Sequence, residues 1–309
     1  MTIGIIGNGV IGNIFAHYLN SQPIHLLCRH HNNPVKTLTL PDAKNALAIN
    51  AEVQTIESVF KTCYDAIIIP VKYHQLDSVI NALKPNLAAS TCLILIQNGV
   101  GGGELLQQNF PNNDIYIGTT TDAGYLVNNN VQMTAYGRLE LGIWKSALRA
   151  ENLNHTKNNS ITEQNAHPAI KTLLQYHPNA CWAESVDTIL LSKLAINAVI
   201  NPLTAILNIK NGQLRDYPNQ VSQLKSEVFC VLQAYGFVFE ADALSKRIDE
   251  VITLTAENYS SMHQDFRNKR QTEIDGVLGF LLKQANILEL NVPNIVRLFN
   301  DIKNKEKPR

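Results

Sequence analysis

Short apolar runs alternate with helix-like stretches along the first part of the chain. Continuous apolar runs are typical of strands buried on both faces, whereas apolar residues spaced three or four apart are typical of helices. The alternation predicts βαβ units around a parallel sheet. The predicted strands are Thr2–Ile6, Ile24–Cys28, Ala66–Pro70, Cys92–Ile96, Ile115–Thr119, Val131–Ala135 and Leu139–Ile143, and the predicted helices are Ile11–Asn20, Tyr73–Leu83 and Glu104–Asn109.

The pattern changes twice farther along the chain. Between Lys145 and Asn165 it becomes rich in Asn, Lys, Glu, Thr and Ser, which predicts a surface loop or mobile insertion. After about Ala183 the strand signal disappears and helical periodicity continues to the C-terminus. We therefore expect an α/β chain with a parallel-sheet domain over residues 1–183 and an all-helical domain over residues 184–309.

A ladder of polar residues interrupts the first apolar helix of the second domain. Lys193, Asn197 and Asn201 are four residues apart, so they share one helix face within the apolar run from Leu190 to Leu203. No Asp or Glu in this stretch pairs with the lysine. The ladder is either a solvated stripe or a functional surface. Pro202 should bend or end the helix because it lacks an N–H.

A glycine-rich turn lies between the first predicted strand and the first predicted helix. The sequence Gly7-Asn8-Gly9-Val10-Ile11-Gly12 has the pattern G-x-G-x-x-G. In this context the first glycine allows a tight turn, the second lets the backbone approach a pyrophosphate, and the third lets helix and strand pack closely. The helix N-terminus then attracts the anion. We expect a Rossmann-type domain in which residues Gly7, Asn8, Gly9, Val10, Ile11 and Gly12 bind a dinucleotide.

The end of the second strand predicts which nicotinamide cofactor binds. A carboxylate there would bind a ribose 2′-hydroxyl, whereas an arginine suits a 2′-phosphate. The segment from Leu26 to His31 contains Arg29 and no acid. Arg29 and, after the third strand, Lys72 are therefore candidate phosphate ligands, although each could be an ordinary exposed base. The sequence predicts NADPH rather than NADH.

Three further residues are candidates for the site, and each has a simpler structural explanation. Asn98 follows a strand end that faces the ligand crevice of a parallel sheet, where it could orient the nicotinamide end of the cofactor or the substrate, but Asn-Gly is also a common turn pair. Ser261 with Gln264, and Thr272 with Asp275, resemble capping boxes. Capping could explain Ser261, and a favourable position at a helix terminus could explain Glu273.

Composition excludes several classes of protein. The 309 residues include 26 Lys plus Arg and 26 Asp plus Glu, so the chain has no excess charge for binding nucleic acid or a membrane surface. Five scattered cysteines and nine histidines show no metal-ligand spacing, which predicts no metal site and a reducing compartment. We expect no export leader and no membrane span, and therefore a cytoplasmic protein.

Taken together, these motifs resemble those of the ketopantoate reductase (2-dehydropantoate 2-reductase) family. The resemblance covers nearly the whole chain. Its most specific part is the run Lys193-x-x-x-Asn197-x-x-x-Asn201-Pro-Leu-Thr-Ala, with Ser260-Ser261-Met262 and Thr272-Glu273-Ile274-Asp275 downstream. Asp122 departs from the pattern, because a neutral residue or histidine is expected there; it could tune the cofactor side of the site or face solvent.

The resemblance implies NADPH-dependent reduction of ketopantoate to (R)-pantoate, a step toward pantothenate and coenzyme A, in a cleft between the two domains. It implies that Lys193 is the general acid, that Glu273 is a carboxylate near it, and that Asn98, Asn197, Asn201 and Ser261 bind substrate. The alternatives are a reductase of another 2-keto or 3-keto acid and a non-catalytic NADPH-binding regulator. We expect a small keto acid as partner and a monomer or homodimer.

Overall fold

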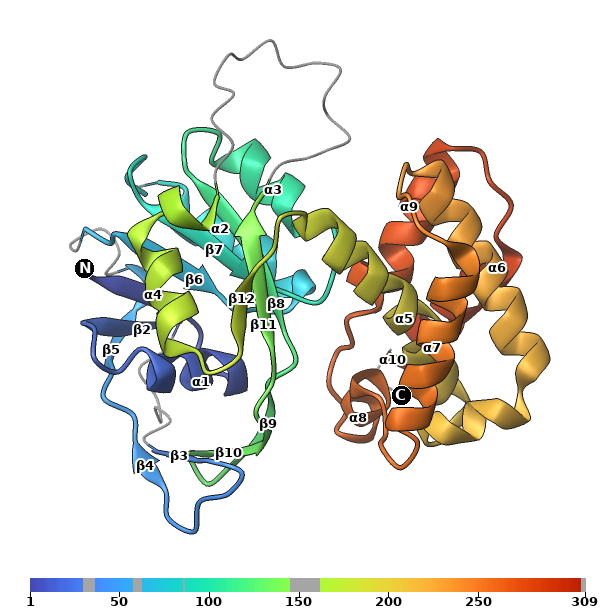
Figure 1. The fold of residues 1–309 in the computed structure, drawn as a ribbon, viewed down its shortest axis with the longest axis horizontal. Helices are drawn as coiled ribbons and strands as arrows, with labels where there is room; N and C mark the ends of the chain where they lie inside the picture. The colour runs from blue at the N-terminus through green and yellow to red at the C-terminus, as the bar shows by residue number, and fades with distance from the viewer. Residues whose placement is uncertain (30–36, 58–62, 86, 145–161, 307–309) are drawn as a thin grey trace. The chain divides into compact units, whose positions relative to one another are not determined.

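The structure is a computed structural model that describes residues 1–29, 37–57, 63–85, 87–144 and 162–306 (Figure 1). The chain forms two compact units. The first contains residues 1–97 and 102–186, and the second contains residues 98–101 and 187–309. Most of the insertion predicted between Lys145 and Asn165 lies outside the described residues.

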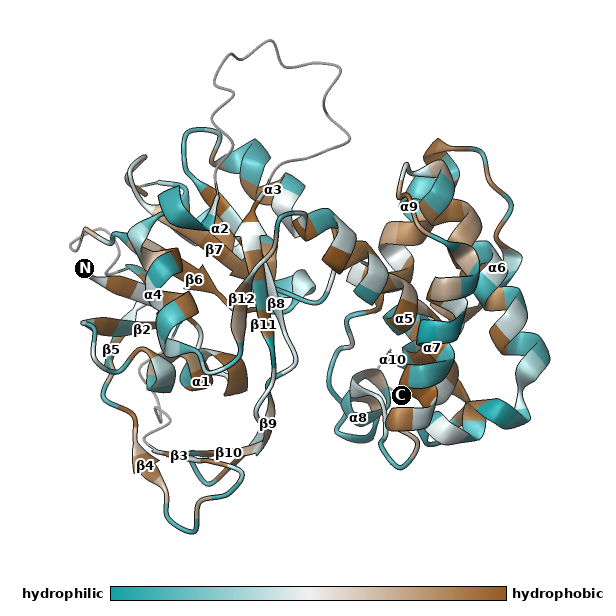
Figure 2. Cartoon of the chain, in the orientation of Figure 1, coloured by the Kyte–Doolittle hydropathy of each residue, from teal (hydrophilic) through white to brown (hydrophobic). Residues whose placement is uncertain are grey.

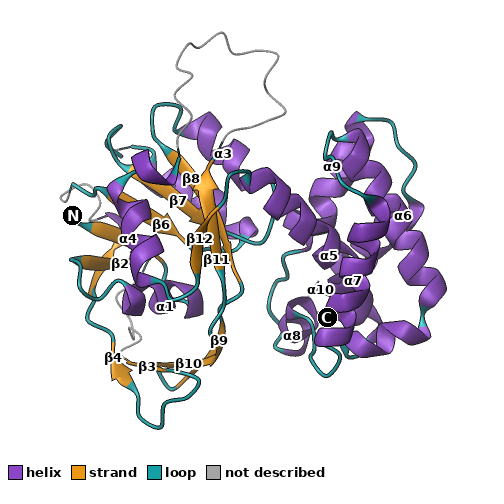
Figure 3. Ribbon diagram, in the orientation of Figure 1, coloured by secondary structure: helices purple, strands orange, loops and turns teal. Residues whose placement is uncertain are grey.

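An eight-stranded, mostly parallel sheet lies at the centre of the first unit (Figure 3). Its strand order is β12-β11-β8-β7-β6-β1-β2-β5, and β11 pairs with β8 in the antiparallel direction. The strands are β1 (Ile3–Ile6), β2 (Ile24–Cys28), β5 (Glu52–Thr55), β6 (Ala66–Ile69), β7 (Cys92–Ile96), β8 (Ile115–Thr120), β11 (Leu139–Ile143) and β12 (Ala180–Trp182). Every residue of β1, β6 and β7 is buried, which explains why these strands appear in the sequence as unbroken apolar runs.

Helices pack on the central sheet, and a smaller sheet packs against α1. The helices are α1 (Val10–Tyr18), α2 (Leu76–Leu83), α3 (Gly102–Asn109) and α4 (Pro168–Tyr176), with short 3-10 turns at Tyr73–Gln75 and Glu163–Asn165. Apolar residues of α1 and α4 share one core with the strands. A second sheet has the order β4-β3-β10-β9, formed by β4 (Leu47–Ala48), β3 (Thr37–Thr39), β10 (Asn130–Ala135) and β9 (Ala123–Val127). Its residues Leu38, Val131 and Met133 pack against Ile14, so α1 is packed on two sides.

The described part of the second unit is helical apart from its connecting turns. It contains α5 (Val186–Leu207), a 3-10 segment (Asn211–Asp216), α6 (Pro218–Ala234), α7 (Ala241–Leu254), α8 (Ser261–Arg267), a π-helical turn (Asp275–Gly279), α9 (Phe280–Ile287) and α10 (Pro293–Glu306). Leu194, Leu224, Val228, Leu281 and Ile295 are fully buried in this unit. Figure 2 shows hydrophobic residues concentrated on α5 and on the central strands of the first unit.

Helix α5 bears on two expectations. It continues through Pro202 to Leu207, so the proline does not end it. Val199 and Leu203 on either side are buried, and this packing offsets the one hydrogen bond that proline removes. Among the described residues, α5 is also the one helix long and apolar enough to cross a membrane by length and composition. However, 61% of its most apolar 18-residue window is buried inside the protein, as in the core helix of a globular unit.

Candidate functional site

The three glycines of the N-terminal turn have three different surroundings. Gly7 has a φ of +93°, a left-handed conformation that favours glycine. A Cβ on Gly12 would lie 2.8 Å from the Gly7 carbonyl oxygen, so only glycine lets α1 approach the turn this closely. A Cβ on Gly9 would have no atom within 4 Å, so the space beside this residue is open. The turn therefore offers a ligand access to the backbone at Gly9.

The N-terminus of α1 fits an anionic ligand. Gly9 is the N-cap residue and supplies no side-chain hydrogen bond to the first amides of the helix. These amides and the positive end of the helix dipole can therefore bind a phosphate. The Asn13 side-chain amide, which the motif did not single out, donates to Asn8 Oδ1 at 2.9 Å and to the Gly9 carbonyl at 2.8 Å. Asn13 is fully buried and holds the turn in shape.

Arg29 lies at the end of β2, as the sequence predicted, and its side chain is exposed. Its guanidinium donates to Ser78 Oγ on α2, and Ser78 Oγ in turn donates to the Gln75 carbonyl at 2.8 Å. Ser78 is a partner that the sequence pattern did not reveal, because it lies 49 positions away. Lys72 is half-buried and precedes the 3-10 turn that leads into α2. Two basic residues thus lie after β2 and β6, two strands that flank β1.

The loop after β7 groups with the helical unit. It contains Asn98, which is half-buried, and Gly99, which is buried. The Val100 amide donates to the Gly276 carbonyl at 3.3 Å, and a Cβ on Gly99 would lie 3.4 Å from the Gly276 backbone. The two backbones approach closely because neither glycine carries a side chain. Asn98 is thereby tied to the segment that carries Glu273.

The polar ladder lies within α5. Lys193, Asn197 and Asn201 are each half-buried, while Leu194 and Ala198 beside them are fully buried. The helix therefore presents one cation and two amides from an otherwise apolar element. These groups can hold a carboxylate or a hydroxyl, and the ammonium can neutralise charge that develops on a substrate oxygen.

The residue that caps α8 is Ser260 rather than Ser261. Ser260 Oγ accepts from the His263 amide at 3.1 Å, and Thr204 Oγ1 on α5 donates to it at 2.7 Å. The side-chain amide of Gln264 donates to the Tyr259 carbonyl, so the predicted capping box was wrong. The helix begins one residue earlier in the Ser-Ser pair than the box requires. Ser261, freed of the capping role, is exposed at the first position of α8.

Glu273 is half-buried and lies just before the π-helical turn. The expected box between Thr272 and Asp275 is absent: Thr272 Oγ1 accepts from the Ile274 amide at 3.2 Å, and the Thr272 amide donates to Glu306 Oε1 at 2.7 Å. Both interactions differ from those of a capping box, because Thr272 Oγ1 accepts from Ile274 rather than Asp275 and the Thr272 amide donates to Glu306 on α10. All six residues proposed for catalysis and substrate binding belong to the second unit, and the proposed cofactor residues other than Asn98 belong to the first.

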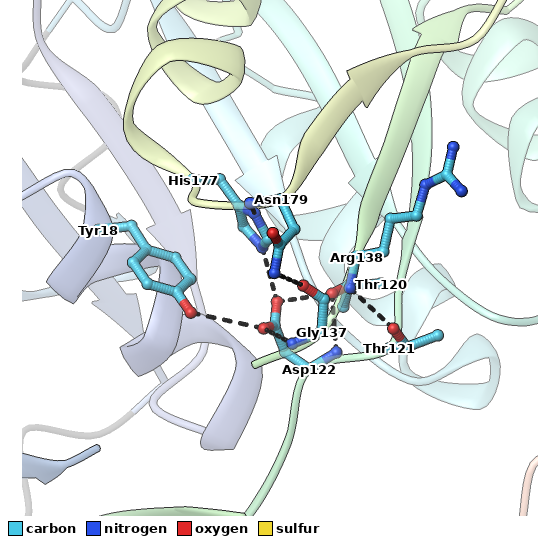
Figure 4. Close-up of polar contacts among 8 residues, drawn as sticks. All are labelled: Tyr18, Thr120, Thr121, Asp122, Gly137, Arg138, His177 and Asn179. Carbon is cyan, nitrogen blue, oxygen red and sulfur yellow. Dashed lines mark hydrogen bonds and ion pairs between the residues drawn. The ribbon is translucent and has the colours of Figure 1, made fainter. Parts of the chain in front are cut away.

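Asp122 is buried, so the expectation that it could face solvent was wrong (Figure 4). Its carboxylate accepts from His177 Nε2 at 2.8 Å, Thr120 Oγ1 at 2.6 Å and the Gly137 amide at 2.8 Å, with Tyr18 Oη at 3.5 Å. Burial alone would raise the pKa of Asp122, but the hydrogen bonds from His177, Thr120 and Gly137 hold it below its ordinary value. The carboxylate is therefore ionised at neutral pH.

The hydrogen-bond partners of His177 define which of its ring nitrogens donates and which accepts. The Asn179 amide donates to Nδ1 at 3.2 Å, so Nδ1 is an acceptor and Nε2 carries the proton donated to Asp122. The ring thus donates through Nε2 to a buried anion. This cluster joins the end of β8, the turn before β11, the end of α4 and the last residue of α1, and no sequence motif predicted His177 as a member.

Comparison with known proteins identifies similar chains over the full length. The family model described as ketopantoate reductase PanE/ApbA matches residues 3–146, and the model of its C-terminal domain matches residues 185–306. A 2-dehydropantoate 2-reductase of Escherichia coli O157:H7 is 31% identical over 99% of this chain and 95% of its own length.

Solved structures show the same fold. A probable 2-dehydropantoate 2-reductase from Bacillus subtilis has a TM-score of 0.81 and 25% identity, covering 99% of this chain and all of that chain. A D-mandelate dehydrogenase solved with NADH and anilino(oxo)acetate has a TM-score of 0.82 at 20% identity, covering 99% of this chain and 98% of its own. At that identity the second likeness shows the fold alone.

Proposed function

The chain belongs to the ketopantoate reductase family, and we propose from this premise that it reduces 2-dehydropantoate to (R)-pantoate with NADPH. It is an oxidoreductase, because its full-length relatives are. The observation that carries the proposal is the placement of Lys193, Asn197 and Asn201 on α5, in a unit that also holds Asn98, Ser261 and Glu273. This is the residue set that the family resemblance assigns to catalysis and substrate binding.

The first unit has the features needed to bind the cofactor. Gly7, Gly9 and Gly12 with the N-terminus of α1 would hold the pyrophosphate, and Arg29, supported by Lys72, would hold the 2′-phosphate. When bound, the nicotinamide supplies the hydride that the keto carbon accepts. The exposed guanidinium of Arg29 is a good partner for a phosphate dianion, which favours NADPH over NADH.

The second unit has groups suited to substrate binding and proton transfer. Reduction turns the keto oxygen into an alkoxide, which must be stabilised and protonated. The Lys193 ammonium would do both, first as a neighbouring cation and then as the donor of a proton from Nζ. Asn98, Asn197, Asn201 and Ser261 would bind the substrate carboxylate and hydroxyl, and Glu273 would keep Lys193 charged and oriented.

The location and assembly of the enzyme are also part of the proposal. The described cysteines are free, and α5 is mostly buried within the protein, which supports an enzyme of a reducing compartment, the cytoplasm. Formal neutrality gives no support to nucleic-acid or membrane binding. A monomer or a homodimer would fulfil this role.

An assay with the purified protein tests the substrate. NADPH oxidation is measured with ketopantoate and, in parallel, with trimethylpyruvate, which keeps the branched keto acid but lacks the hydroxyl group. Benzoylformate and acetoacetate represent other 2-keto and 3-keto acids. We expect ketopantoate to have the highest kcat/KM. Higher activity with another acid would favour the alternative reductase, and no turnover of any acid would favour a binding protein.

Substitution of Lys193 tests the general acid. Lys193→Ala should lower kcat by about 10²–10⁴-fold, because the alkoxide loses its proton donor, while NADPH binding is unchanged. Lys246→Ala, which removes an exposed lysine of α7, is the matched control and should keep full activity. A Lys193→Ala enzyme with most of its turnover would show that the proton comes from elsewhere.

A further inference from the structure

The last turn of α10 holds the segment that carries Glu273. The Thr272 amide donates to Glu306 Oε1 at 2.7 Å, and Lys303 Nζ donates to both oxygens of Asp275, at 3.0 and 3.2 Å. Lys303 and Glu306 also form an ion pair with each other at 3.6 Å. Two residues of α10 thus bind the chain on either side of Glu273, one residue before it and two residues after it.

We call Lys303 and Glu306 the brace. The hydrogen bonds that the brace makes are well placed to be strong. Thr272 and Ile274 are fully buried, and the Glu306 side chain is only 10% exposed, so water competes weakly for the Thr272 amide. Burial alone would lower the pKa of Lys303, but its hydrogen bond and attraction to Asp275, with the charge of Glu306, raise it above its ordinary value. Lys303 therefore remains a cation at neutral pH.

A third contact to the same segment comes from the loop after β7. The Gly276 carbonyl accepts from the Val100 amide, within the loop that carries Asn98. Gly276 belongs to the π-helical turn, a wide turn that is often found at functional sites. Contacts from α10 and from the loop of Asn98 therefore hold the chain before and after Glu273.

We propose that Lys303 and Glu306 are positioning residues that act on the reaction through Glu273. The inference rests on the proposed function, since it assumes that Glu273 takes part in catalysis. Neither residue needs to touch the substrate or the cofactor. A shift of about 1 Å in a catalytic group can cost about 10²-fold in rate, so loss of the brace lowers turnover without removing any reacting group.

The test is a double-mutant cycle with Glu273→Gln. Lys303→Met and Glu306→Ala should each lower kcat about 10-fold while the KM for NADPH changes much less, because all the proposed cofactor residues except Asn98 belong to the other unit. Lys303→Arg keeps the charge and should restore most of the activity. Glu306→Gln keeps an oxygen for the Thr272 amide, so its kcat should lie between those of the wild type and Glu306→Ala. Arg297→Met, an exposed substitution on the same helix, is the control.

The double variants show whether the brace works through Glu273. In the Glu273→Gln background, Lys303→Met should cause little further loss, because the group it positions is already gone. A full additional 10-fold loss there would overturn the inference while leaving the role of Glu273 intact. If Glu273→Gln alone keeps wild-type kcat, both the brace and that part of the proposed function are refuted. Thermal unfolding of each variant shows whether a loss of activity is caused by unfolding. If Lys303→Met or Glu306→Ala unfolds, the activities of Lys303→Arg and Glu306→Gln decide whether the brace acts on catalysis.

Discussion

The guanidinium of Arg29 is the residue-scale feature that should decide between the two nicotinamide cofactors. A charge-assisted hydrogen bond contributes about 1.5–3 kcal/mol, so Arg29→Ala should weaken NADPH binding by about 10–100-fold and leave NADH binding nearly unchanged. Binding is measured by fluorescence titration with each cofactor. Arg297→Ala, which removes an exposed arginine from the other unit, should alter neither affinity. An equal loss for both cofactors would assign Arg29 a general rather than a discriminating role.

The sequence predicts where a residue lies along the chain better than which residues it contacts. Arg29 lies directly after β2, as expected, and its role as a phosphate ligand stays a prediction; its partner Ser78 belongs to α2. Ser260 and Ser261 are adjacent and identical; the His263 amide identifies Ser260 as the cap of α8, and Ser260 is also held by Thr204, 56 positions away. The environment of Asp122 depends in the same way on His177, 55 positions away. Partners of this kind leave no periodic signal.

The glycines of α1 give an element-scale prediction that separates ligand binding from folding. Gly9→Ala adds a methyl group to open space at a φ of −86°, so stability should hardly change while NADPH binding falls because the methyl occupies the approach to the backbone. Gly12→Ala places its Cβ 2.8 Å from the Gly7 carbonyl oxygen and should destabilise the unit by about 1–3 kcal/mol. Urea unfolding and NADPH titration measure the two effects. Equal destabilisation by both variants would contradict the assigned roles.

Elements with strong periodicity were predicted within one or two residues, and β2, β7 and β11 were predicted at their observed bounds. The strands β3, β4, β5, β9 and β12 were missed because each is short or partly exposed and has no continuous apolar run. Helix α4 was missed as well, since it follows the polar stretch that hid its beginning. The continuation of α5 past Pro202 depends on burial, a tertiary effect that local sequence does not report.

At the scale of the whole molecule, the unfolding of the first unit can be followed by itself in solution. Both tryptophans, Trp144 and Trp182, belong to the first unit, so intrinsic fluorescence reports the unfolding of that unit. The cluster around Asp122 lies in the same unit and joins α1, α4 and the end of β8. A binding partner that stabilises only the first unit, such as NADPH, should therefore raise the fluorescence midpoint in urea.

The same probe tests how the first unit depends on pH. The folded state holds the pKa of Asp122 below its ordinary value, so its contribution to stability is complete above the unfolded pKa of about 3.9 and is lost as pH falls through the folded pKa. Asp122→Asn should cost about 2–5 kcal/mol at pH 7, because an amide cannot accept all the bonds made by the carboxylate and leaves buried donors unpaired. Below about pH 4 the difference between the variant and wild type should shrink, since wild-type Asp122 then becomes protonated as well.

Glu163→Gln, at an exposed position of the first unit, is the control and should parallel the wild type. A constant difference between Asp122→Asn and wild type across this range would mean that the cluster stabilises the unit through packing rather than through the charge of Asp122.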